Sequence, residues 1–104
     1  MTFKVTVAKQ SYDFSGPYTQ PDQLASKSGT YLVTTKKKSG AHKFLDVGES
    51  VDVKNRVENH DRADCWVRKK KNGLFYSGYY CDETARTKLA DDIREAFDLP
   101  CGKR

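Results

Sequence analysis

Polar residues that could do chemistry are concentrated between Asp46 and His60. Gly48 and Ser50 follow an apolar segment, and Arg56 and His60 come next, four residues apart. Residues at that spacing lie on one face of a helix, so the guanidinium and the imidazole would be neighbours. A guanidinium forms a planar fork that matches phosphate oxygens, and free N–H groups at a helix start also attract anions. The stretch therefore predicts an anion site with Gly48 and Ser50 as phosphate-binding residues.

Two strands and a helix are needed to hold these side chains. Residues Gly29–Thr35 are rich in β-branched and aromatic residues and predict a strand, and Phe44–Val47 predicts a second. We expect the two to pair as an antiparallel hairpin with a long basic loop. Val53 and Val57 then recur at helical spacing, so we expect a helix capped by Ser50 that ends near residues 59–61.

The chain before residue 29 is predicted to form an N-terminal extension. Phe3, Val5 and Val7 alternate with polar residues, which indicates a half-buried strand. Residues 11–18 contain a Gly-Pro pair and are expected to form a loop. A short helix is then expected to begin at Pro21.

The C-terminal third is predicted to contain a strand and a long helix. Residues 74–81 predict the strand, and the basic segment 65–71 before it could be either a strand or a solvated loop. Asn72-Gly73 separates the two and is typical of tight hairpin turns. A final helix is expected over residues 82–97. Its predicted buried face consists of Ala85, Leu89, Ile93, Ala96 and Phe97.

The composition sets limits on fold and partners. A chain of 104 residues forms one domain, and its net charge of +5 is compatible with a phosphate-bearing partner. Its N-terminus has no apolar run typical of a signal peptide, and no segment approaches membrane thickness. We therefore expect a cytoplasmic protein with no membrane partner; the oligomeric state is left open.

The cysteines give a weaker indication. Cys65, Cys81 and Cys101 are odd in number and widely spaced, which argues against a disulfide framework. Together with His60 they could bind zinc, but no CxxC pair anchors such a site. We therefore expect reduced thiols that pack as small apolar residues.

The order of elements predicts an α/β chain of the α+β type. The order strand, hairpin, strand, helix, strand, helix leaves too little chain for parallel βαβ repeats. Residues 1–28 would form the strand and loop extension, and residues 29–104 would form the main domain as a single compact unit.

At this point a resemblance to a known family becomes specific. Gly29-Thr30-Tyr31, then Asp46-Val47-Gly48-Glu49-Ser50, then Arg56 and His60, resemble the GIY-YIG nuclease motif. That motif contains Gly-x-Tyr, Tyr-x-Gly-x-Ser, an Arg six residues later and a His four further on. The resemblance covers about residues 29 to 100. It implies a small three-stranded antiparallel sheet flanked by helices, which agrees with the predicted elements and to which the N-terminal strand is an addition.

The resemblance implies metal-dependent hydrolysis of phosphodiester bonds in nucleic acid, DNA in particular. Tyr31 would position or deprotonate the attacking water, and Arg56 would stabilise charge that develops on the phosphoryl oxygens. His60 would assist proton transfer or orientation of the reacting groups. A Glu on the last helix would bind Mg²⁺ or Mn²⁺ (magnesium or manganese).

Two departures from the family pattern weaken the catalytic interpretation. Asp46 replaces the second motif Tyr, and neither Ala90 nor Asp91, where the metal-binding Glu should lie, is a Glu. Helical geometry places Asp92 beside the predicted buried face, so Asp92 is our provisional metal ligand.

Each of these residues also has a purely structural alternative. Tyr31 could be a strand aromatic, Arg56 could pair with Asp52, and His60 could cap a helix. Asp92 could pair with a basic neighbour, and the runs at 36–38 and 69–71 could be solvated loops. Two hypotheses follow: a GIY-YIG endonuclease, or a catalytically inactive domain of that type that binds nucleic acid or a protein partner.

Overall fold

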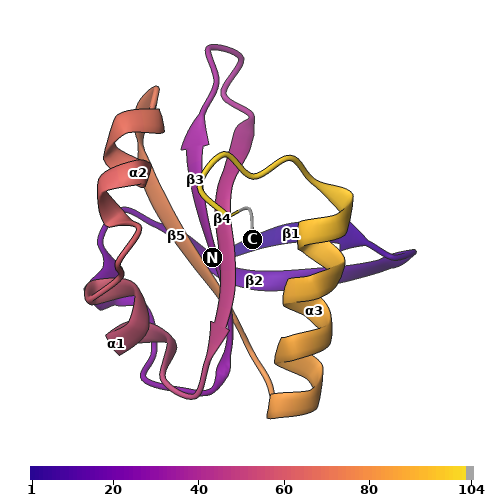
Figure 1. Ribbon diagram of the computed structural model, residues 1–104. Coiled ribbons are helices and arrows are strands. Elements are labelled where there is room, and N and C mark those ends of the chain that lie inside the picture. The colour runs from indigo at the N-terminus through magenta and orange to yellow at the C-terminus, as the bar shows by residue number, and fades with distance from the viewer. Residues whose placement is uncertain (103–104) are drawn as a thin grey trace.

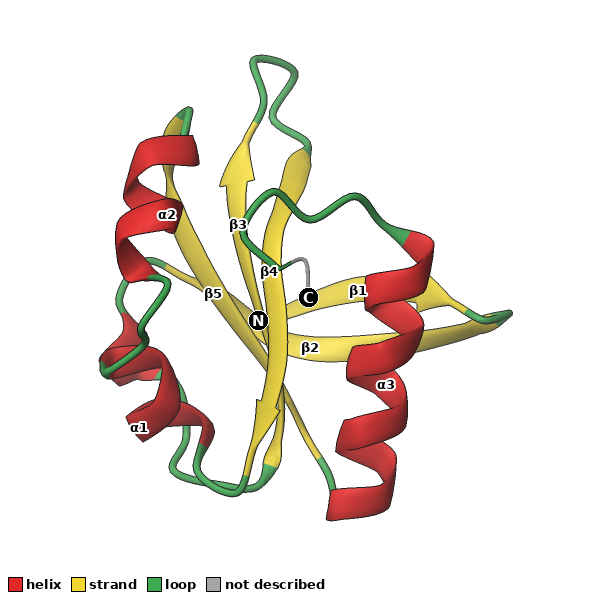
Figure 2. Cartoon of the chain, in the orientation of Figure 1, coloured by secondary structure: helices red, strands yellow, loops and turns green. Residues whose placement is uncertain are grey.

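The computed structural model describes residues 1–102, which form one five-stranded sheet with helices on both faces (Figures 1 and 2). All neighbouring strands are antiparallel, in the order β1-β2-β5-β3-β4. The strands are β1 (Thr2–Val7), β2 (Gln10–Tyr18), β3 (Gly29–Lys36), β4 (His42–Ser50) and β5 (Asn72–Tyr80). The helices are a 3-10 turn η1 (Pro21–Gln23), α1 (Val53–Glu58), α2 (Ala63–Lys69) and α3 (Glu83–Ala96).

The predicted α+β class is confirmed, but the sheet has five strands rather than three plus one N-terminal strand. Residues 11–18 belong to β2, which pairs with both β1 and β5. The Gly-Pro pair that suggested a loop is tolerated because the β2–β5 register shifts between Ser15 and Tyr18. Gly16 has a positive φ of 121° there, a conformation that favours glycine.

The segment around residues 63–73 also differs from expectation. It forms α2 and the start of β5, so the predicted turn at Asn72-Gly73 is wrong. The apolar anchor of α2 is Trp66, which is buried, while Arg68 and Lys69 are exposed. One buried aromatic side chain in two turns gives only a weak helical periodicity. The run of basic residues therefore did not indicate a helix.

Side chains of β3 alternate between two apolar layers, one on each face of the sheet. Tyr31 and Val33 pack with Val53, Val57 and Trp66 under α1 and α2. Leu32 points to the other face, where the core contains Leu89, Ala90 and Ile93 of α3. Figure 2 shows the same division, with α1 and α2 on one side of the strands and α3 on the other.

The sheet is curled, so its two edge strands approach each other. Phe3 on β1 lies with its ring centroid 5.0 Å from His42 and 6.1 Å from Phe44, both on β4. Residues 97–102 follow the exposed edge of β4, where the Cys101 amide donates to the Leu45 carbonyl over 2.9 Å. No helix within residues 1–102 is long and apolar enough to cross a membrane.

A disulfide joins Cys65 on α2 to Cys101, so the expectation of reduced thiols is wrong for these two residues. Only the fold brings them together, since 36 positions separate them in the sequence. Cys81 is a free thiol whose pKa is raised, chiefly by burial.

Reduction of the disulfide should lower the free energy of unfolding by about 4 kcal/mol, because the unfolded chain regains the entropy of a loop of this length. Urea unfolding with and without a dithiol, in a Cys81→Ala background, measures the loss. A Cys65→Ser/Cys101→Ser double variant should be insensitive to the reductant. Equal stability of the oxidised and reduced chains would contradict the expectation.

Candidate functional site

Tyr31 and Gly48 face each other across the β3–β4 ladder. The Tyr31 side chain is 2% exposed, and a Cβ at Gly48 would collide with its hydroxyl and ring. Gly48 is itself buried. The glycine therefore provides space for the phenol ring. The Tyr and the Gly of the motif are thus required together by the packing of β3 against β4.

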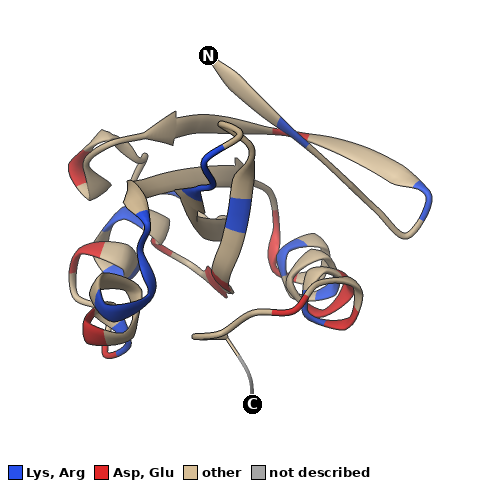
Figure 3. Cartoon of the chain, turned by 90° about the horizontal axis from the view of Figure 1, so that it is seen from above, with Lys and Arg blue, Asp and Glu red and all other residues tan. Residues whose placement is uncertain are grey.

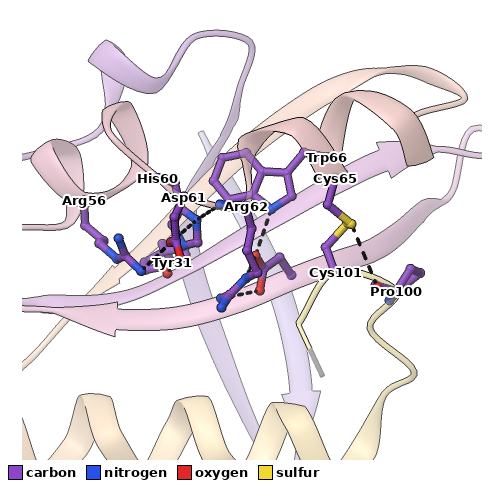
Figure 4. A network of polar contacts seen from close by, with 10 residues as sticks. Tyr31, Arg56, His60, Asp61, Arg62, Cys65, Trp66, Pro100 and Cys101 are labelled. Atoms are coloured by element: carbon purple, nitrogen blue, oxygen red, sulfur yellow. Dashed lines mark hydrogen bonds and ion pairs between the residues drawn. A yellow bond between two sulfur atoms is a disulfide. The ribbon is translucent and has the colours of Figure 1, made fainter. Parts of the chain in front are cut away.

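His60 lies in the connection between α1 and α2, and its side chain contacts Tyr31 (Figure 4). The Arg62 amide N–H donates to His60 Nδ1 over 3.0 Å, so the neutral ring carries its proton on Nε2. His60 Nε2 thus donates to the Tyr31 hydroxyl oxygen, which lies 2.6 Å from this nitrogen. Both ring nitrogens are thus engaged within the protein, and the His60 side chain has no exposed surface.

Asp46 is the charged centre of the same cluster. Its side chain is fully buried on β4 and accepts hydrogen bonds from Arg62 Nε over 2.9 Å and Arg62 Nη2 over 3.0 Å. Trp66 Nε1 donates a third bond over 2.8 Å. A buried carboxylate requires such partners, because the cost of removing it from water must be offset. Asp46 therefore ties β4 to α2.

Burial determines the protonation of the aromatic members. It lowers the pKa of His60 to about 4, and the nearby Arg56 cation acts in the same direction. Burial raises the pKa of Tyr31, as does the charge of Asp46, while Arg56 and Arg62 oppose the rise. At neutral pH both rings are uncharged, which suits a buried structural pair better than a proton-transfer pair.

Arg56 lies nearer the surface, with 39% of its side chain exposed. Its Nη2 binds Asp61 Oδ1 at 3.0 Å, in place of the pairing with Asp52 that the sequence offered as an alternative. Of the three predicted catalytic residues, Tyr31 and His60 are in contact and Arg56 approaches them from outside.

The predicted phosphate-binding start of α1 is occupied by the protein's own groups. The expected cap is wrong: Asp52, not Ser50, caps the helix by accepting from the Asn55 amide over 3.1 Å. The Ser50 hydroxyl instead bonds the Asp52 backbone. A carboxylate already holds the position that a phosphate would take, and α1 has only six residues.

Asp92, the provisional metal ligand, lies on the opposite side of the sheet from Tyr31. Its Oδ2 accepts from Lys88 Nζ over 2.7 Å, the pairing with a basic neighbour left open by the sequence. Within residues 1–102 no group of three or more His, Cys, Asp or Glu side chains could hold a metal ion.

The buried face of the last helix is rotated by part of a turn from the predicted one. Leu89 and Ile93 are buried as expected, but Ala90 is buried as well, whereas Ala85 and Ala96 are exposed. Arg86 belongs to the inward side, and its Nε binds Glu49 Oε1 on β4 at 2.6 Å. α3 therefore directs a cation, paired with a strand carboxylate, toward β4.

Sequence reasoning missed Arg62 and Trp66. The available signal was Asp46 itself, a carboxylate between the apolar residues Leu45 and Val47 of a strand. Such a charge needs a cationic or N–H partner within the fold. The motif spacing could not identify the partners of Asp46, because Arg62 and Trp66 belong to the start and the middle of α2, a helix that was not predicted.

A second surface feature arises from strand pairing. Lys36 on β3 pairs with Asn72 on β5, which brings together the lysine-rich segments that follow β3 and precede β5. We call this surface the basic end; it comprises Lys36, Lys37, Lys38, Lys43, Arg68, Lys69, Lys70 and Lys71. Figure 3 looks down on it. All eight side chains are exposed, and a groove of about 550 Å³ among them is lined by Lys37, Lys38, Lys43, Lys71 and Asn72.

No family model, no curated protein and no solved structure matches this chain.

Replacement of Asp46 by Asn should lower the free energy of unfolding by about 2 to 3 kcal/mol, because the half-buried Arg62 guanidinium loses its counter-charge. Asp92→Asn is the matched control. It removes one partner of an ion pair whose Lys88 is largely exposed, and should cost less than about 1 kcal/mol. Chemical unfolding of both variants measures the difference, and equal losses would contradict an anchoring role for Asp46.

Acid should destabilise the protein through His60. Between about pH 6.5 and pH 4 the unfolded chain binds a proton at this residue and the folded chain does not. The free energy of unfolding should therefore fall as the pH is lowered through this window, by at most about 3 kcal/mol from His60. Urea unfolding at several pH values should show a shallower slope for His60→Gln. His42→Gln serves as the control and should retain the His60 contribution.

Proposed function

We propose that this protein is a catalytically inactive GIY-YIG-like domain that binds nucleic acid, DNA in particular, through the basic end. The observation that carries this proposal is the β3–β5 pairing, which joins two lysine-rich segments distant in the sequence. No Asp or Glu occurs between residues 34 and 45 or between residues 65 and 81. Acidic side chains within these segments therefore do not compete for the exposed cations.

A regularly charged polyanion is the ligand that such a surface favours. Each phosphate contacted by a lysine releases condensed counterions, so several adjacent lysines add favourable terms. Their long, flexible side chains act as point charges and suit a phosphate backbone without requiring one fixed geometry. Contacts of this kind supply affinity and position the ligand but read no base sequence.

Three features of the site support the non-catalytic half of the proposal. Tyr31 and His60 are buried and bonded to each other, which leaves neither hydroxyl nor imidazole facing a substrate. Asp92 belongs to the layer on the other face of the sheet. Finally, Arg86 brings a positive charge toward β4 from that layer.

The cytoplasmic location inferred from the sequence is part of the same proposal. In the cytoplasm the Cys65–Cys101 disulfide has to resist reduction, since glutathione and thioredoxin keep most cytosolic thiols reduced.

Binding should depend strongly on salt and on the basic end. We expect the logarithm of the association constant to fall linearly with the logarithm of salt concentration. In a Lys37→Gln/Lys38→Gln/Lys71→Gln variant the magnitude of that slope should fall by about 2 to 3, close to one unit for each phosphate that is no longer neutralised. Fluorescence anisotropy with a labelled DNA measures it. The control Lys4→Gln/Lys9→Gln/Lys27→Gln removes the same charge elsewhere and should retain most of the slope.

The same samples test catalysis. We expect no cleavage of plasmid or single-stranded DNA with Mg²⁺ or Mn²⁺. Metal-dependent cleavage that Arg56→Ala abolishes would overturn the non-catalytic half of the proposal and restore the endonuclease hypothesis. Equal salt slopes for the two triple variants would overturn the basic end as the binding surface.

A further inference from the structure

A half-buried aromatic side chain adjoins the basic end. Phe75 on β5 lies outside both apolar core clusters. The Lys36 ammonium nitrogen is 5.0 Å from the centroid of its ring, a cation–π arrangement. The imidazole of His42 meets the same ring edge-on, with centroids 5.1 Å apart. A phenyl ring thus lies directly beneath one of the lysines of the basic end.

Strand register explains how these rings come together. Thr34 pairs with Phe75 on one side and with Phe44 on the other, and Lys36 pairs with His42. The curl of the sheet adds Phe3 beside His42. An aromatic row therefore crosses β1, β4 and β5 on the α3 face.

The row extends past the end of α3. Phe97, just after the helix, packs against Phe44 with ring centroids 4.5 Å apart and ring planes tilted by 47°. His42 lies two residues nearer the basic end than Phe44, and the Phe75 ring contacts both Lys36 and, across β3, His42. The aromatic surface thus runs from the helix-covered core to the lysines.

Flat aromatic rings beside a line of cations suit one class of nucleic acid. In a single strand the bases can leave their stack and lie on protein side chains while the backbone follows the positive charge. In a duplex the base faces are already stacked on each other. Stacking tolerates any sequence, because every base has a π-face, and it needs no hydrogen-bond donor within the platform.

We propose that the ligand of the basic end is single-stranded nucleic acid, with a base stacked on Phe75. This inference rests on the proposed nucleic-acid function and narrows its substrate class. The base takes the place of the Lys36 ammonium over the ring, and the flexible Lys36 side chain turns to an adjacent phosphate. The groove lined by Lys37, Lys38 and Lys71 receives the backbone that continues from that nucleotide. DNA and RNA strands share this chemistry.

The test compares three labelled ligands of equal length, about 12 nucleotides. They are an oligothymidine, a duplex, and an abasic strand that retains the phosphates but lacks bases. We expect the wild-type chain to bind oligothymidine about tenfold more tightly than the abasic strand or the duplex, the effect of one stacked base. Phe75→Leu should lose that tenfold for oligothymidine and bind the abasic strand unchanged. The control is Tyr12→Leu, which replaces a half-buried aromatic side chain near the turn of the β1–β2 hairpin. This variant should behave as wild type. An oligouridine arm compares RNA with DNA.

A second variant gives a direct signal from the platform. Phe75→Trp should retain the preference, and its indole fluorescence should be quenched by oligothymidine but not by the abasic strand. Trp66 is buried under the opposite face and supplies a constant background. Equal affinities for the oligothymidine and the abasic strand, with no quenching, would overturn the stacking inference alone. Absence of salt-dependent binding to all three ligands would instead overturn the proposed function beneath it.

Discussion

The buried carboxylate of Asp46 is the constraint on which the site depends. An anion within a strand between apolar layers is tolerated only if hydrogen-bond donors surround it. Here the donors come from α2 and from the residue that caps its start. Arg62 supplies the counter-charge and Trp66 supplies an N–H. Their positions fix α2 against β4, and the Arg62 backbone in turn orients the imidazole of His60. The buried Asp46 thus determines which side of α2 faces solvent.

This dependence explains which parts of the fold could be predicted from the sequence. β3 and α3 were found because strong local patterns specify them, and the β3–β4 hairpin followed. β2 was missed because a Gly-Pro pair normally interrupts a strand, yet a register shift accommodates it here. α2 was missed because its main inward residue, Trp66, is held by a partner 20 residues earlier. Local periodicity cannot report an interaction of that range.

The candidate site shows the same division. Motif spacing correctly brought Tyr31, Gly48 and His60 into one neighbourhood, but it gave no information on accessibility. The spacing is equally compatible with a buried hydrogen-bonded pair, and burial is decided by the α1–α2 layer above it. Asp46 was interpreted as a missing hydroxyl, although its charge made it the anchor. The two lysine-rich segments looked like separate solvated loops, and only the placement of β5 beside β3 makes them one surface.

The covalent bond between Cys65 and Cys101 also gives the chain an unusual mechanical property. Tension applied between residue 1 and residue 102 can pass through the sulfur atoms, so the backbone of residues 66–100 cannot be pulled out to its full length while the bond is intact. That protected loop contains β5 and α3, the strand at the centre of the sheet and the helix that covers one of its faces. A force that peels β1 or β4 from an edge would therefore leave these two elements joined within a closed ring, from which the sheet could re-form once the load is released.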